Sequence, residues 1–295
     1  YTQSSGMFLA QTASSSTTII TVNGNTTISG TGRLSLTISN QKSPTPNPEK
    51  VLNHNLYENC SCRLDLKGNL SVITGGILST DDPADVWFSK SGTQIYTSGG
   101  SVSGNFNFYV KSGAVLGFAD KTTTLYVPLA TFTLESGAGM IISHRYGISS
   151  IGAIGCIGIN TTSFSTGANY EYCTDDNHET GTGLPFTVNN FAKSGTGSVT
   201  LTSASLTVSG TATWTAGTFA IPSKTLTMNG SIVNNAGTLS CNTSTAINVG
   251  GSGSTSVLPA VTGSPASLTI NRSAGVTMGG ALSVTNLTLT SGNLT

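Results

Sequence analysis

The chain has 295 residues, only 8% of them charged, and its 12 basic side chains balance its 12 acidic ones. A neutral, charge-poor surface argues against nucleic acid as a partner, because binding it requires clustered lysine and arginine, and also against anionic membranes. No run reaches the roughly 18 consecutive apolar residues of a membrane-spanning helix, so no membrane insertion is expected.

Short segments that alternate apolar residues with Thr, Ser or Asn recur along the chain, and each is followed within two residues by Gly, Asn or Ser. Alternation with period two predicts a β-strand with one buried face, and the residues that follow permit tight turns. Such strands are expected at residues 18–22, 34–38, 106–110, 205–208, 225–228 and 286–289. The predicted core side chains, with outward threonines between them, are Ile20, Leu36, Val110, Leu134, Leu206, Leu226 and Leu289.

In chain order, residues 1–40 are expected to form an N-terminal cap and the first coils. Residues 41–62 then break the pattern with three prolines and predict an insertion that protrudes from one face. Within it, Asn47 followed by Pro48 predicts the start of a short helix. Residues 148–159 break the pattern again with isoleucine at every third position, which we interpret as a packed, glycine-rich excursion.

The strand-like segments are spaced regularly. Leu206 and Leu226 lie in similar segments 20 positions apart, and Val110 and Leu134 lie in similar segments 24 positions apart. A period near 20 residues that carries strands and no helical stretch predicts an all-β parallel β-helix, or β-solenoid. Each rung then stacks on the next, sharing one core and a ladder of backbone hydrogen bonds. Residues 63–160 are expected to form the first part of this solenoid.

The second part, residues 161–295, carries a longer repeat on top of the short one. Residues 199–204 resemble residues 276–281, an offset of 77 positions. Four coils of about 20 residues account for such an offset, so the two periods are interpreted as one architecture. We expect this repeat to continue beyond Thr295.

Residues 163–172, 180–190 and 283–294 resemble the repeat regions of very large secreted surface proteins of bacteria that export cargo by the type IX secretion route. Residues 132–138 fit the coil that usually precedes such repeats, and the resemblance covers somewhat more than half of the chain. It implies a β-solenoid stalk, located outside the cell or on its surface. The function expected from it is structural or adhesive, in a stalk or filament, without catalysis and without a cofactor.

A polysaccharide lyase or hydrolase is the main alternative, since parallel β-helices also carry such enzymes. Their sites require carboxylates, Lys or Arg clustered on one face of adjacent rungs. The acidic residues around Asp82 and around Asp175 lie beside Pro, Gly or Asn, which favours solvated loops. We therefore do not expect an enzyme.

Two of these loops are candidates for binding. Asp82 and Asp85 precede Trp87, whose ring is suited to contact a surface glycan. Asp175 and Asp176 offer the oxygen ligands that calcium prefers, although the regular Gly-Asp repeat of calcium-binding solenoids is absent. No other metal is expected.

The five cysteines match no zinc-binding spacing. They are interpreted either as buried free thiols or, for Cys156 and Cys173, as a disulfide that joins neighbouring coils. A third functional class is ice binding, which uses flat arrays of Thr-x-Thr on β-solenoids. The sequence shows threonine-bearing segments but no Thr-x-Thr at a fixed place in each coil, and a flat face with threonines in register would favour this class.

The final segment, residues 287–295, stops inside a repeat without a cap. An uncovered rung presents unpaired N–H and C=O groups, which natural proteins avoid. The expected partners are therefore further repeats of the same chain or other copies of it, arranged end to end.

Overall fold

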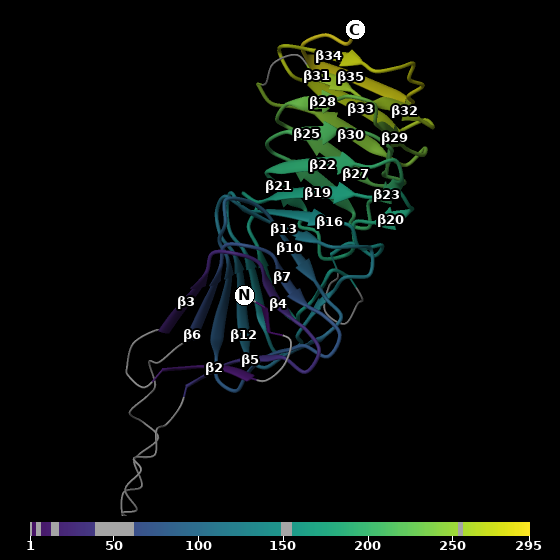
Figure 1. Cartoon of the computed structure of the whole chain (residues 1–295). Coiled ribbons are helices and arrows are strands. Elements are labelled where there is room, and N and C mark those ends of the chain that lie inside the picture. The colour runs from purple at the N-terminus through teal and green to yellow at the C-terminus, as the bar shows by residue number, and fades with distance from the viewer. Residues whose placement is uncertain (1, 4–6, 13–17, 39–61, 149–154, 253–255) are drawn as a thin grey trace, which may run out of the picture.

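The computed structural model describes all residues except 1, 4–6, 13–17, 39–61, 149–154 and 253–255. The described part is all-β without a helix, and its parallel strands stack in about ten turns with equivalent residues about 22 positions apart. The predicted parallel β-solenoid is therefore confirmed. Figure 1 shows the stack as an elongated body, with the C-terminal turns in yellow at its upper end. No described segment is a helix long and apolar enough to cross a membrane.

Each turn contributes strands to three faces. The first face is a ten-stranded sheet that contains β1 (Thr2–Gln3), β4 (Thr26–Ile28), β7 (Leu70–Val72), β10 (Gly92–Thr97), β13 (Ala114–Phe118), β16 (Gly139–Ile142), β19 (Asn169–Cys173), β22 (Asn190–Ser194), β25 (Ala212–Trp214) and β28 (Ile232–Asn234). Two further strands take the same position in the later turns, β31 (Ser256–Leu258) and β34 (Val276–Met278).

The second face consists of three shorter sheets. They are β2 (Met7–Thr12), β5 (Arg33–Ile38), β8 (Ile77–Thr80) and β11 (Ser101–Ser103); then β14 (Leu125–Tyr126) and β17 (Ile157–Gly158); then β20 (His178–Glu179), β23 (Ser198–Thr200), β26 (Thr218–Ala220), β29 (Thr238–Ser240) and β32 (Ala260–Thr262).

The third face consists of two six-stranded sheets. They are β3 (Thr18–Val22), β6 (Cys62–Leu66), β9 (Ala84–Phe88), β12 (Phe106–Val110), β15 (Thr131–Leu134) and β18 (Thr161–Phe164); then β21 (Thr187–Val188), β24 (Ser205–Val208), β27 (Thr225–Met228), β30 (Ala246–Val249), β33 (Ser267–Asn271) and β35 (Asn286–Ser291).

The short sequence period corresponds to the strand register. Leu206 lies opposite Leu226, and Val110 lies opposite Leu134, as their spacing predicts. The spacing is not constant, because the corners differ in length. Gly139 pairs with Asn169, 30 positions later, across the turn that contains residues 148–159. The described isoleucines of that excursion, Ile148, Ile157 and Ile159, are buried.

The interpretation of the 77-residue offset as four coils is wrong. Val199 lies in β23 on the second face, whereas Val276 lies in β34 in the position of the first face. Four coils instead carry the register from Val188 to Ile270, which is 82 positions. Strand-and-corner segments on different faces obey the same alternation, so similar sequences recur without being structurally equivalent.

Most of the predicted core is confirmed, since Leu36, Val110, Leu134, Leu206 and Leu226 are all buried. Two residues differ. Ile20 is only partly buried, because β3 pairs with β6 alone. Leu289 is 50% exposed, because β35 pairs with β33 alone and no described strand covers its other side.

The N-terminal stretch belongs to the stack. β2 pairs with β5 along its whole length, and β1 pairs with β4, so the expected cap region supplies strands of the first turn. The insertion predicted at residues 41–62, with its short helix at Asn47 and Pro48, lies outside the described residues except for Cys62, which begins β6.

The interior also holds two cationic side chains. Lys193 and Arg272 are fully buried, and both donate hydrogen bonds to main-chain carbonyl oxygens at corners: Lys193 to those of Ser194 and Gly195 in its own turn and Ala216 in the next, and Arg272 to that of Gly250 in the preceding turn. Most of the remaining interior is apolar, including the rings of Phe191 and Phe219, whose centroids are 4.8 Å apart. Burial of this continuous apolar column is the main stabilising contribution.

Candidate functional site

The sequence candidates for glycan contact lie at the start of β9 on the third face. Asp85 and Trp87 face outward from this strand, two positions apart, whereas Asp82 belongs to the corner before it. Asp85 accepts a 3.1 Å hydrogen bond from Asn107 Nδ2 of the next turn. The structure thus brings Asp85 and Trp87 onto one surface and leaves Asp82 outside it.

The ring of Trp87 is occupied by neighbouring side chains. The Arg63 guanidinium carbon lies 4.0 Å from the ring centroid and Lys111 Nζ lies 4.1 Å from it, both within cation–π range. The Tyr109 ring packs edge-on at 5.9 Å. A sugar that stacks on Trp87 must displace these cations, so this surface is a poor platform for a glycan.

The two calcium candidates lie in the corner that follows β19. Asp175 Oδ1 accepts hydrogen bonds from Thr196 N and Oγ1, at 2.9 and 3.0 Å. Asp176 forms an ion pair with Lys121, with 2.5 Å between Oδ2 and Nζ. These donors hold the pKa of both carboxyl groups below its ordinary value. In the described part of the chain, no three His, Cys, Asp or Glu side chains are grouped so as to hold a metal ion.

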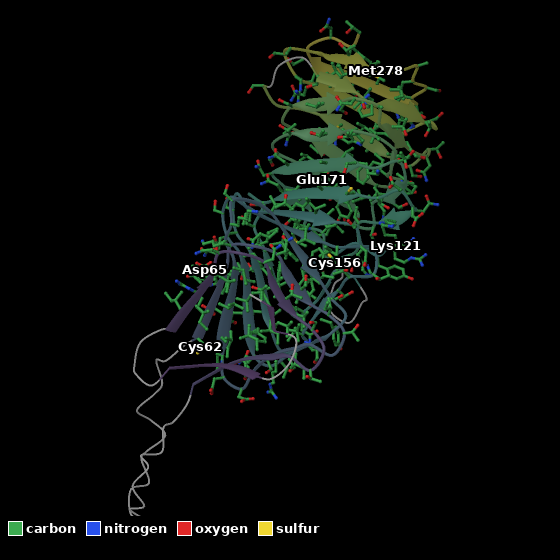
Figure 2. All side chains as sticks on the ribbon, in the orientation of Figure 1. Cys62, Asp65, Lys121, Cys156, Glu171 and Met278 are labelled. Atoms are coloured by element: carbon green, nitrogen blue, oxygen red, sulfur yellow. The ribbon has the colours of Figure 1, made fainter. Side chains whose placement is uncertain are left out.

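Of the two alternatives for Cys156 and Cys173, free thiols or a disulfide, the structure has the free thiols. Both thiols are free, and Cys156 is buried whereas Cys173 is exposed. The reason is their orientation: Cys173 ends β19 with its side chain directed outward, while Cys156 (labelled in Figure 2) is fully buried in the stack. Burial raises the pKa of the Cys156 thiol well above its ordinary value, which makes it unreactive.

A pocket of about 280 Å³ lies at the corner between the first and second faces. We call it the corner pocket, and it is lined by Lys121, Thr122, Arg145, Asp176, Asn177 and His178. These residues come from three successive turns. Arg145 N donates to Lys121 O at 3.4 Å, and Glu179 N donates to Arg145 O at 2.9 Å, so the backbone ladder stacks them.

Three charged side chains line the corner pocket, in a chain in which only 8% of the residues are charged. Lys121 and Asp176 form their ion pair at the rim, with about 60% of each side chain exposed. Figure 2 shows Lys121 at the side of the stack. A slightly larger groove, about 310 Å³, crosses the first face above β16, but Glu171 is the one charged residue in its lining. The corner pocket is therefore the better candidate for chemistry or charged recognition.

Two buried histidines lie at this corner. His178 is only 5% exposed, and neither of its ring nitrogens has a hydrogen-bond partner among the described residues. His144 is 4% exposed, and its Nδ1 accepts a 3.2 Å hydrogen bond from Tyr146 N. Burial lowers the pKa of both imidazoles below the ordinary 6.5, against the opposing effects of Asp176 on His178 and of Asp120 on His144. Both are therefore neutral at pH 7.

The exposed Arg145 is held over an aromatic ring. Its guanidinium carbon lies 5.2 Å from the centroid of Tyr146, which is 45% exposed. In contrast to Lys121, it has no carboxylate within 4 Å in the described structure. Its planar fork is therefore available to an anionic ligand.

Acid is expected to destabilise the fold below about pH 6.5, the ordinary pKa of histidine. Because the folded pKa values of His144 and His178 are lower, the unfolded chain binds more protons between those values and 6.5. The free energy of unfolding must then fall as the pH falls through this window. Urea unfolding between pH 8 and pH 5 measures it. A His178→Leu variant should show a weaker dependence on pH, and an unchanged slope would exclude His178 as a cause.

Only one side of the corner pocket was recognisable from the sequence. Asp175 and Asp176 stood out as an acidic loop, but Lys121 and Arg145 did not. A usable signal was present, since these two residues are 24 positions apart, the same spacing as Val110 and Leu134. His178 lies in the same turn as Asp176 but comes 33 positions after Arg145, because that turn is longer, so the 24-residue spacing does not connect it with the other two turns.

The third face of the later turns carries one column of threonine in register, although, as the sequence indicates, Thr-x-Thr does not recur at a fixed place in each coil: across two adjacent outward columns it occurs in β27 alone, at Thr225 and Thr227. One outward column contains Thr187, Thr207, Thr227, Asn248, Thr269 and Thr288. A second column beside it contains Ser205, Thr225, Ala246, Ser267 and Asn286. Adjacent strands are about 4.8 Å apart and the two columns roughly 6.6 Å apart, which produces a regular array of methyl and hydroxyl groups.

Comparison with known proteins gives no relative. No protein-family model, no curated protein and no solved structure matches the chain.

Proposed function

We propose that this chain is a structural or adhesive segment of an extracellular surface protein, forming a stalk or filament without catalysis. The observation that carries the proposal is the unbroken stack of parallel turns, in which the first face alone joins ten strands by backbone hydrogen bonds. Such a ladder extends along the molecule and provides length and stiffness, which are the properties required of a stalk.

The surface chemistry supports the same role. The outward positions are mostly Thr, Ser and Asn, and the formal net charge is zero. This surface is hydrated but attracts no particular partner over most of its area. The resemblance of residues 163–172, 180–190 and 283–294 to secreted repeat proteins supports secretion, and the type IX route is part of the proposal.

Partners in this proposal are further repeats of the chain or other copies, arranged end to end. The side of β35 that faces away from β33 presents Leu287 and Leu289, which are 48% and 50% exposed. A strand that paired with β35 would cover both leucines and would hydrogen-bond to the backbone groups on the open edge of β35.

The proposal is tested on the isolated chain by electron microscopy combined with a screen for polysaccharide cleavage. We expect unbranched rods and no release of reducing ends or unsaturated sugars from any common polysaccharide. Cleavage that is abolished by Asp176→Asn would contradict the non-catalytic role and favour a lyase or hydrolase. Asp85→Asn, on the third face, is the matched control.

Ice binding is the second candidate, and the threonine column of the third face favours it. Five of the six residues in the first column are threonine, in strict register from β21 to β35. If this array orders water, the chain should inhibit ice recrystallisation, and Thr227→Leu should abolish the inhibition. Thr213→Leu, which alters an outward threonine of the first face, should leave the inhibition intact. A native chain without any inhibition would exclude this function.

A further inference from the structure

The corner pocket has the properties of a built binding site rather than of a solvated loop. It is lined from three turns, it is concave, and its wall includes the buried, neutral imidazole of His178, whose nitrogens have no partner within the described structure. Leaving a polar group at a buried position without a hydrogen-bond partner costs free energy. A ligand that hydrogen-bonds to His178 would offset this cost, which is a reason for the pocket to be occupied.

We propose that the corner pocket binds the carboxylate-bearing sugar of an acidic polysaccharide, with Arg145 holding the carboxylate and His178 a hydroxyl. That this ligand is the target of adhesion depends on the function proposed above. The binding contacts depend only on the geometry of the pocket. The volume of about 280 Å³ is at the small end for ligand sites, which suits a single sugar ring of a longer chain.

Arg145 makes the pocket selective for a negatively charged ligand. A guanidinium forms two parallel hydrogen bonds with a carboxylate, and this bidentate contact is stronger than a neutral hydrogen bond. The ring of Tyr146 at 5.2 Å keeps the guanidinium in place. Within the lining, Lys121 and Arg145 outnumber the single carboxylate of Asp176, and His178 is neutral, so the lining carries one net positive charge.

The other lining groups fit the hydroxyls of a sugar. The Lys121–Asp176 pair offers an ammonium donor and a carboxylate acceptor at the rim, 2.5 Å apart. Asn177 adds an amide that both donates and accepts. Two carboxylates outside the lining, Asp120 and Asp175, already accept hydrogen bonds, the first from Thr122 and Thr123 and the second from Thr196.

The test is isothermal titration calorimetry of the full chain with three tetrasaccharides of similar length. They are tetragalacturonate, its methyl ester, which removes the charge and keeps the shape, and a chitosan tetramer, which is cationic. We expect tetragalacturonate to bind at least tenfold more tightly than the other two. Arg145→Gln should weaken tetragalacturonate binding at least tenfold, and Lys90→Gln, an exposed cation at a different corner, should not change it.

Circular dichroism shows whether each variant is folded, and Arg145 is exposed, so its replacement should not alter the fold. Equal affinity for the acid and the ester, a preference for chitosan, or no binding of tetragalacturonate would overturn the inference without affecting the stalk. Cleavage of tetragalacturonate to an unsaturated product, lost in Arg145→Gln, would support the site and contradict the non-catalytic role.

Discussion

Replacing Arg272 with methionine is expected to lower the free energy of unfolding by about 3–5 kcal/mol. The guanidinium of Arg272 is fully buried at a corner of the stack. Its Nε and Nη2 donate to Gly250 O at 3.0 and 2.7 Å, Nη1 donates to Ser256 Oγ at 2.7 Å, and Nη2 also donates to Gly230 O. Methionine fills similar space but removes these donors from Gly230 O and Gly250 O, whereas Ser256 Oγ keeps its hydrogen bond from Ile232 N.

Chemical denaturation of the two proteins measures this difference. Arg145→Met is the matched control, because Arg145 is exposed and forms no ion pair in the described structure; it should change stability by less than about 0.5 kcal/mol. If Arg272→Met lost no more stability than this control, the hydrogen bonds from Arg272 to carbonyl oxygens of neighbouring turns would not stabilise the fold.

Gly75→Ala is expected to destabilise the chain by about 3–4 kcal/mol. Gly75 has a φ of +79°, in the left-handed region, which costs an alanine about 1–2 kcal/mol. A Cβ at this corner would also lie 2.1 Å from Gly30 O of the preceding turn. That contact is between two backbones, so neither side can rotate away, and the two turns must separate.

Gly113→Ala is the matched control for the steric part of this effect. Gly113 has nearly the same φ, +81°, but a Cβ there meets nothing within 4 Å. It should therefore lose only the conformational part, about 1–2 kcal/mol. The two variants are compared by thermal or urea unfolding. If Gly75→Ala and Gly113→Ala lowered the free energy of unfolding equally, close backbone contact between stacked corners would not contribute to the effect at Gly75.

The fold was predictable because stacking repeats the same requirement in every turn. The 20-residue spacing of Leu206 and Leu226 predicts the register of β24 and β27 directly, and the alternation of their neighbours identifies the inward-facing residues. The lengths of individual turns were not predictable, since a corner tolerates insertions that leave the strands intact. This is why the 77-residue offset of Val199 and Val276 was mistaken for whole turns.

The two buried cations show how the period-two rule applies to charged residues. Lys193 follows the inward Phe191 by two positions, and Arg272 follows the inward Ile270 by two. Alternation therefore places both side chains inside, although their charge suggests the surface. They are accommodated because main-chain carbonyl oxygens at the corners accept their hydrogen bonds.

The corner pocket depends on contacts between distant turns, and sequence alone does not determine these. Asp176 and Lys121 are 55 positions apart and belong to turns of unequal length. Only the register from β13 through β19 brings them together. The isolation of His178 from any hydrogen-bond partner in the described structure is likewise a property of packing, which no local pattern encodes.

The central claim is that this solenoid acts outside the cell as part of a surface structure. Immunogold labelling of intact, unpermeabilised cells of the source organism, with an antibody raised against this chain, tests that claim most directly. The account predicts gold particles along filaments or a surface layer, removed by mild protease treatment of whole cells. Labelling that appears only after permeabilisation would contradict it.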